Sequence, residues 1–395
     1  MKKILQTLLF MGIGGVLGVI IFWMIGFDNI DRMPFWLFVI SYAASFVGIY
    51  VALIATTIIH EVGHLVCGLK SGYKFLSFRI LSFNFCKYED GFKIKRFSIP
   101  GTGGQCLMAP PEYNDGNFKY KLYLAGGNIA TFIVLVTEIL LALFVGLDVV
   151  IGRALLMMAI VSLYLFVLNV IPMTAGGVAN DAYDIRSLGQ NPEHKKEFWL
   201  SLDVNAKSQI GFELSEVGED FDSIDDEELL KETEGIAIQI KLNMKVNYLL
   251  YEKRFEEAYT LCKKLVVDKN VIEFYKNELK CDKMFLEIML DDAENVKKTY
   301  SDSVKLHITN THKFMVQRMR LMYAYYLLIE NDQLKAEKEK KCFEKACLSY
   351  PNLGEVKSER KIMEYVDVLH KKSVEDNKNV DANFTEDSEI VEKEA

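Results

Sequence analysis

The stretch that decides the fold is "TTIIHEVGHLVCG", residues 56–68, which sets two histidines and a glutamate in an otherwise apolar run. His60 and His64 are four residues apart, so a helix would carry both on one face, about 6 Å apart along its axis. Ionisable side chains are costly at membrane depth, where they face a partner or a water-filled cavity. The stretch therefore predicts a membrane helix with a buried polar site.

Four long apolar stretches indicate a multi-pass membrane protein, because about 20 apolar residues cross a bilayer as a helix. They cover residues 4–26, 35–68, 122–146 and 154–173. The first follows "MKK" as a signal peptide would, but its apolar run is long and has no small-residue cleavage site. We therefore expect an uncleaved anchor and about four transmembrane helices.

The distribution of Lys and Arg predicts the orientation in the cell membrane. Segment 70–121 holds nine of these residues, whereas the other two connections hold only Arg32 and Arg153. By the positive-inside rule, this segment, the N-terminus and the C-terminal region are expected to be cytoplasmic. Seven scattered cysteines with no CxxC pair agree with a reducing compartment. The net charge of −8 averages two dissimilar halves, and no nucleic-acid partner is expected.

The HEVGH spacing suits two imidazoles on one zinc ion, with Glu61 placed to take a proton from a water that the metal activates. A chance match and a proton-relay cluster are the alternatives. A catalytic zinc also needs a third protein ligand and an open position. The remaining histidines lie in the charged half without ligand-like spacing: His194, His307, His312 and His370.

Three carboxylates compete for the third position: Glu138, Asp181 and Asp184. At 1.5 Å per residue, HEVGH lies about 10–15 Å from the cytoplasmic boundary and Glu138 about 25 Å from it, which is too deep. Pro172 ends the fourth span, and Gly176–Gly177 permit a sharp turn that returns the chain to the second span. Asp181 is therefore the predicted ligand, whereas Asp184 either orients a ligand or faces water.

The third apolar stretch contains "AGGNIAT", residues 125–131, at the expected depth of HEVGH. Gly126 and Gly127 would let this span approach the second closely. Asn128 would then hydrogen-bond a substrate or a ligand, and Asn169, before the Pro172 break, would do the same. A packing role is the alternative for both asparagines.

Together these motifs resemble the site-2 protease family of intramembrane zinc metalloproteases. The resemblance covers about residues 1–190 and rests on His60, Glu61 and His64, on Gly126-Gly127-Asn128, and on Asn169, Pro172 and Asp181. It implies one zinc ion per chain, held by His60, His64 and Asp181, with Glu61 as the base. It also implies cleavage of a peptide bond in or beside the transmembrane segment of a membrane-embedded protein or peptide precursor.

Between the second and third spans, residues 74–101 alternate partly between apolar and polar side chains, with a turn at Glu89-Asp90-Gly91. This pattern predicts a short β-hairpin. The hairpin would present an edge to a substrate strand or lie at the membrane interface.

The charged half is expected to form three parts. Residues 195–235 contain a strongly acidic run and predict a linker. Residues 236–372 predict a soluble, all-α domain of helical hairpins, loosely similar to tetratricopeptide repeats at 247–266, 285–300 and 325–347. Such an array offers a surface for a cytosolic protein partner, and a plain helical bundle is the alternative. Residues 373–395 are polar and acidic and predict a disordered tail.

Two functions are therefore carried forward. The first is an intramembrane zinc metallopeptidase formed by residues 1–194, with the lipid bilayer and a membrane-embedded substrate as its partners. The second is a membrane-anchored scaffold that recruits a cytosolic partner through its helical-hairpin domain and keeps only a vestigial metal site.

Overall fold

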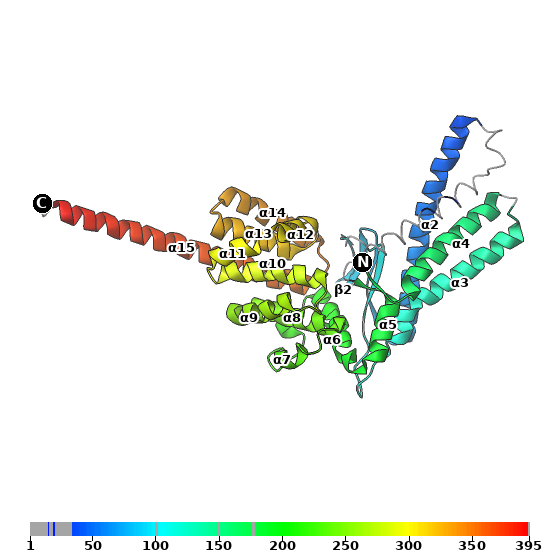
Figure 1. Cartoon of the computed structure of the whole chain (residues 1–395), viewed down its shortest axis with the longest axis horizontal. Helices are drawn as coiled ribbons and strands as arrows, with labels where there is room; N and C mark the ends of the chain where they lie inside the picture. Colours follow the sequence, from blue (N-terminus) through cyan, green and yellow to red (C-terminus); the bar gives the residue numbers. More distant parts are fainter. Residues whose placement is uncertain are drawn as a thin grey trace.

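The computed structural model describes residues 15, 19, 34–98, 102–147, 150–175 and 178–393. Apart from residues 15 and 19, the predicted span at 4–26 lies outside these ranges. Figure 1 shows an elongated molecule, with a bundle of long helices at one end, a compact group of helices at the other and a small sheet between them. The two ends correspond to the apolar and the charged halves of the sequence.

Three helices form the bundle: α2 (Phe35–Lys70), α3 (Lys121–Val145) and α4 (Val150–Val170). Their apolar segments Phe46–Lys70, Lys121–Val145 and Ile151–Val170 have mean hydropathies of 1.7, 2.3 and 2.2. All three are long and apolar enough to cross a membrane. They correspond to three of the four predicted stretches, and their apolar outer side chains, such as Phe132 and Phe144, are exposed as lipid-facing residues would be.

Helices α2 and α3 cross with their backbones in contact, because glycines lie at the crossing on both sides. A Cβ atom on Gly63 would lie 2.2 Å from the carbonyl oxygen of Gly126, and one on Gly126 would lie 2.5 Å from the carbonyl oxygen of Gly63. Small residues permit this close approach of membrane helices. The crossing brings the HEVGH motif of α2 against the Gly126-Gly127 segment of α3.

A four-stranded antiparallel sheet follows α2, in the order β3-β2-β1-β4. The strands are β1 (Lys74–Ile80), β2 (Phe83–Tyr88), β3 (Gly91–Arg96) and β4 (Gly104–Ala109). The sequence predicted only a hairpin, and its Glu89-Asp90 turn joins β2 to β3. Strand β4 was not expected, because the alternating pattern that predicts strands ends before residue 102. This strand forms one edge of the sheet and packs beside α2.

The predicted linker at 195–235 is wrong, since α6 (Lys195–Ile210) is a packed helix in the middle of the molecule. Gln209 is 1% exposed and donates hydrogen bonds to the carbonyl oxygens of Leu76 and Lys87 in the sheet, at 3.0 and 3.3 Å. A small core forms between α6 and the acidic run, from Leu200, Val204, Val217 and Phe221. The prediction relied on the acidic composition of this segment, but its spaced apolar residues determine how it packs.

The helical tail, residues 236–393, begins after η3 (Leu214–Glu216) and α7 (Asp226–Leu229). Its elements are α8 (Ile236–Tyr251), α9 (Phe255–Val267), α10 (Glu273–Met289), α11 (Ala293–Thr299), α12 (Asp302–Thr311), α13 (Val316–Ala324), the π-helical η4 (Tyr325–Ile329), α14 (Gln333–Ser349) and α15 (Leu353–Lys393). The three predicted repeat segments each contain a helix-to-helix turn. Lys253, Asp291 and Asn331 occupy these turns with positive φ angles of 60°, 57° and 52°.

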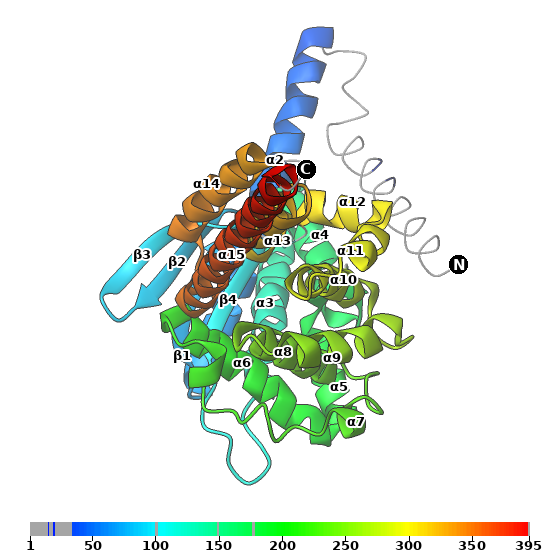
Figure 2. The same ribbon diagram turned by 90° about the vertical axis from the view of Figure 1, so that its left-hand side faces the viewer.

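The tail is attached directly to the sheet. The Tyr88 hydroxyl donates to the carbonyl oxygen of Pro351 at 2.9 Å, and the Lys95 ammonium donates to those of Leu348 and Tyr350 at 3.0 and 3.2 Å. Figure 2 shows α14 and α15 beside β2 and β3. Helix α15 continues to Lys393, where the sequence predicted a disordered tail from 373.

Candidate metal centre

Three side chains from two distant segments converge beside the crossing of α2 and α3. The Nε2 atoms of His60 and His64 lie 3.2 Å apart, and Oδ2 of Asp181 lies 3.2 Å from the first and 3.3 Å from the second. Among the described residues, this is the one group of three His, Cys, Asp or Glu side chains whose possible metal-ligand atoms all lie within 4.8 Å of one another. The residues predicted as metal ligands therefore lie together.

The hydrogen bonds behind the two rings fix their protonation. Nδ1 of His64 lies 2.9 Å from the carbonyl oxygen of Tyr123, which can only accept, so this nitrogen carries the proton. Nδ1 of His60 lies 3.1 Å from the Thr131 hydroxyl, which already donates to the carbonyl oxygen of Gly127 at 2.9 Å. It must therefore accept from His60. Both rings consequently direct Nε2 to the centre of the cluster, and in the neutral form of each ring this nitrogen is an acceptor.

Three acceptor atoms that face one another at about 3 Å repel unless a positive charge lies between them. Oδ2 of Asp181 is also buried and has no hydrogen-bond donor among the described residues. A proton would satisfy one pair of these atoms, whereas a metal ion would satisfy all three. Tetrahedral ligands at about 2.0–2.1 Å from zinc are about 3.3 Å apart, so the donor set and its spacing fit this ion.

Hydrogen bonds of Asn180, at the start of α5 (Asp181–Gln190), position Asp181 beside the histidines. The Asn180 side chain accepts from the backbone N–H of Tyr183 at 2.9 Å and caps the helix. Its amide also donates to the carbonyl oxygens of Leu168 and Ile171, both at 2.7 Å. The short strands β5 (Thr174–Ala175) and β6 (Val178–Ala179) return the chain between these points. The end of α4 is thereby locked to the residue before Asp181.

Gly127 lies against the Nε2 atoms of the two imidazoles. A Cβ atom at this position would lie 2.4 Å from Nε2 of His60 and 2.5 Å from Nε2 of His64. Only glycine leaves room for both rings here. The role of Gly127 is therefore to make space for the rings.

Glu61 lies next to the ligand cluster but outside it. Its side chain packs against the edge strand, since a Cβ atom on Gly104 would lie 2.8 Å from Oε1 of Glu61. The carboxylate accepts a hydrogen bond from the backbone of Cys106 and feels the charges of His60, His64 and Asp181. Strand β4 therefore holds this carboxylate beside the position that a metal ion would occupy.

Sequence reasoning missed Arg79, which supports the strand next to Glu61. Arg79 is 1% exposed, and its guanidinium donates to the Thr102 hydroxyl at 2.6 Å and to the carbonyl oxygen of Leu81 at 3.1 Å. Burial lowers its pKa, and the charge of Glu61 opposes this shift. The alternation of side chains along β1 could have indicated that Arg79 is buried, because it places Arg79 on the same face as the buried Ser77.

The two predicted asparagines meet where α3 contacts α4, but only Asn128 bonds the other helix, whereas Asn169 bonds its own. The Asn128 amide donates to the carbonyl oxygen of Asn169 at 3.3 Å, and the Asn169 amide donates to that of Leu165 at 3.0 Å. Oδ1 of Asn128 is buried and has no donor among the described residues. The pair joins α3 to α4 and leaves one acceptor for another group.

The two other carboxylates lie apart from the ligand atoms. Glu138 is buried between helices, where Ser162 hydrogen-bonds it and the hydroxyls of Ser162 and Thr56 lie 3.2 Å apart. Burial and the charge of Asp181 raise the pKa of Asp184 to about 7. The charge of Asp184 in turn acts on Tyr275 in the tail.

Comparisons of the chain with protein-family models, with curated proteins and with solved structures found no match.

Proposed function

We propose that this protein is an intramembrane zinc metallopeptidase that hydrolyses a peptide bond in or beside the transmembrane segment of a membrane-embedded substrate. One observation carries the proposal. Ligand atoms from His60, His64 and Asp181 face one another at 3.2–3.3 Å, and Nδ1 of each ring is hydrogen-bonded behind the cluster, so that one metal ion would satisfy all three ligand atoms. Next to them lies a buried carboxylate that the cluster does not use.

In this proposal His60, His64 and Asp181 hold one zinc ion per chain. When bound, zinc would polarise the scissile carbonyl and lower the pKa of water towards about 7. Glu61 accepts the proton of the attacking water and delivers it to the leaving amine. The backbone of Cys106 and the close approach of Gly104 keep the Glu61 carboxylate oriented.

Strand β4 offers a way to hold the substrate. A transmembrane helix hides its scissile carbonyls, and an unwound segment in lipid leaves its backbone groups unpaired. Strand β4 is at the edge of the sheet and begins beside Glu61, so its outer backbone groups are placed to pair with such a segment. This pairing would present an extended peptide next to the metal centre.

The proposed location is the cell membrane, with the N-terminus and the helical tail in the cytoplasm. The Lys and Arg residues of segment 70–121 support this orientation. The β2–β3 hairpin also exposes an apolar face, since Phe85, Phe92 and Ile94 are 43%, 72% and 66% exposed. A hairpin that lies against the surface of a bilayer would present such a face.

The test compares wild type with Glu61→Gln in zinc-supplied proteoliposomes, using a model transmembrane peptide with a Gly-Pro break as substrate. We expect wild type to cut the peptide, and Glu61→Gln to cut it about 10²–10⁴-fold more slowly while it retains zinc. Glu89→Gln, an exposed carboxylate at the β2–β3 turn, is the matched control and should keep wild-type activity. Equal cleavage by Glu61→Gln and wild type would end the proposal.

The scaffold function remains the alternative, because the tail has its own core and a polar cavity. Deletion of residues 195–395 would separate the two functions poorly, since α6 and the connection between α14 and α15 contact the sheet directly. Glu61→Gln separates them better. A scaffold would keep its cellular function in this variant, whereas a peptidase would lose it.

A further inference from the structure

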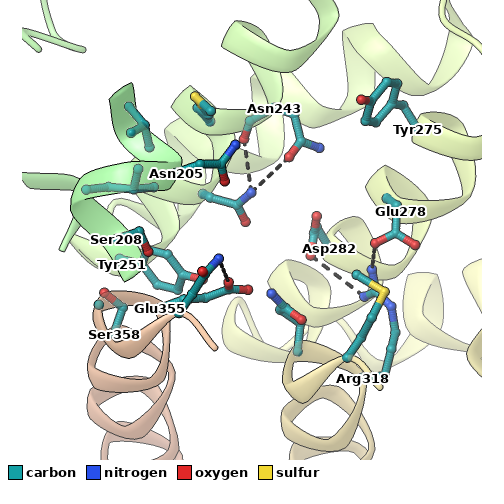
Figure 3. Close-up of a pocket in the computed structure, with 18 of the residues that line it drawn as sticks. Asn205, Ser208, Asn243, Tyr251, Tyr275, Glu278, Asp282, Arg318, Glu355 and Ser358 are labelled. Atoms are coloured by element: carbon teal, nitrogen blue, oxygen red, sulfur yellow. Dashed lines mark hydrogen bonds and ion pairs between the residues drawn. The ribbon is translucent and has the colours of Figure 1, made fainter. Parts of the chain in front are cut away.

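The helical tail contains a polar cavity of about 280 Å³ between α6, α8, α10, α13 and α15. Figure 3 shows side chains from these helices around it, among them Asn205, Asn243, Asp282 and Glu355. The amides are those of Asn205, Asn243 and Asn247, and the carboxylates include Asp282 and Glu355. Ligand pockets for small molecules span about 300–1,000 Å³, so this cavity suits one side chain with its adjoining backbone.

Asp282 is buried at the cavity wall and lacks a close partner. It is 4% exposed, and its nearest cationic atoms are Nη1 of Arg318 at 3.9 Å and Nη2 of Arg320 at 3.7 Å, both on Oδ1. These distances exceed that of a hydrogen bond. Figure 3 shows the other carboxylate oxygen pointing into the cavity. The structure therefore leaves an acceptor exposed to the cavity.

Glu355 faces the same space and has no cation of its own among the described residues. It accepts hydrogen bonds from the Tyr350 hydroxyl at 3.1 Å and from the Asn352 amide at 3.4 Å. Burial and the charge of Glu359 raise its pKa to about 7. A positive charge in the cavity would favour its ionised form.

The charges around the cavity are not balanced. Glu278 is paired with Arg318 and His307, and Glu359 is paired with Arg320. Asp282 is then left with only longer contacts to the same two arginines, and Glu355 has no ion pair among the described residues. Buried carboxylates need paired cations, so the arrangement lacks a positive charge.

We propose that this cavity binds a Lys or Arg side chain of a peptide segment, with the negative charges of Asp282 and Glu355 attracting the cation. The asparagines complete the site. Asn247 donates to Oδ1 of Asn243 at 2.9 Å, which leaves the Asn243 amide nitrogen and the Asn247 amide oxygen available to a peptide backbone. The aliphatic stem of the bound side chain would pack on Met244 and Met315, which line the same cavity.

The cavity is also connected with the candidate metal centre. Tyr275 lines the cavity, and burial and the charge of Asp184 raise the pKa of its hydroxyl. Asp184 lies one helical turn after Asp181. If the proposed function holds, the bound segment is the cytoplasmic flank of the substrate, because such flanks are rich in Lys and Arg. Binding of a basic peptide by the cavity itself does not depend on that function.

The test measures binding of fluorescein-labelled octapeptides to the full chain in detergent, in the Glu61→Gln background so that no peptide is cut. One peptide carries four lysines among Gly and Ser, and the other carries four glutamines instead. We expect Glu355→Gln to weaken binding of the lysine peptide at least about tenfold. Asp282→Asn should weaken it further, with folding checked by circular dichroism. Glu256→Gln, an exposed carboxylate on α9, should have no effect.

The proposal is overturned if the lysine peptide does not bind, if the glutamine peptide binds equally, or if Glu355→Gln and Glu256→Gln behave alike. Because neither zinc nor cleavage enters this measurement, its failure leaves the proposed peptidase function untouched. Loss of cleavage in other experiments would likewise leave the cavity proposal standing.

Discussion

The candidate metal centre and the tail cavity both bury ionisable side chains, but only the tail supplies cations, for two of the four carboxylates around its cavity. Arg318 and Arg320 are each 1% exposed and neutralise Glu278 and Glu359. At the metal centre, by contrast, every inward-facing atom is an acceptor. The comparison teaches that a polar cluster with its own counter-ions contributes to folding, whereas one built only from acceptors requires a bound cation.

The largest expected effect is a loss of stability when one of the buried arginines of the tail is removed. Arg320→Met leaves the buried carboxylate of Glu359 without a cation and that of Asp282 with only Arg318, so it should lower the free energy of unfolding by about 3–5 kcal/mol. Urea denaturation followed by circular dichroism measures this. Arg360→Met is the control, because Arg360 is exposed and pairs with Glu344 on the surface, so its loss should cost at most about 1 kcal/mol. Equal losses would refute a structural role for the buried pairs.

A smaller but sharper effect is expected at Gly127. Gly127→Ala places a methyl group within 2.4–2.5 Å of both Nε2 atoms and must displace the rings. Zinc affinity should therefore fall by more than about 100-fold. Loss of a hydrogen-bond partner of a ligand costs at most about this much, and displacement of the ligands themselves should cost more. Competition with a coloured chelator measures it. Gly48→Ala in α2 meets open space and should bind zinc as wild type does. Normal zinc affinity in Gly127→Ala would contradict the geometry.

The smallest of the three effects concerns the tautomer of His60. Thr131→Val removes the acceptor of the His60 Nδ1–H, so zinc affinity should fall about 10–100-fold with the fold preserved. Thr137→Val on the same helix is matched, since Thr137 bonds only its own helix at the carbonyl oxygen of Ile133. Zinc titration of the two variants compares them. If both bind zinc equally well, the hydrogen bond does not orient the ring.

Much of the candidate site could be predicted from local sequence. The four-residue spacing of His60 and His64 and the depth of each span lead to Asp181, because helix geometry converts residue numbers into distances. The function of Asn180 was not visible, since three of its four side-chain hydrogen bonds depend on how the end of α4 meets α5. Arg79 was missed for the same reason.

The linker was mispredicted because the amino-acid composition of its segment was weighed above the spacing of its apolar residues. The acidic run suggested a linker, yet apolar residues such as Val217 and Phe221 pack beneath it against α6. Strand β4 was missed because strand pairing depends on the partner β1, which is distant in sequence. These are non-local contacts that no short sequence window contains.

The most direct test of the account is the zinc content of detergent-purified protein by elemental analysis. The variants are His60→Ala and Asp181→Ala, with His370→Ala as the control outside the cluster. We expect about one zinc ion per chain in wild type and in His370→Ala, and none in the two cluster variants. Wild type that stays free of metal after zinc is supplied, or Asp181→Ala that keeps its zinc, would contradict the account.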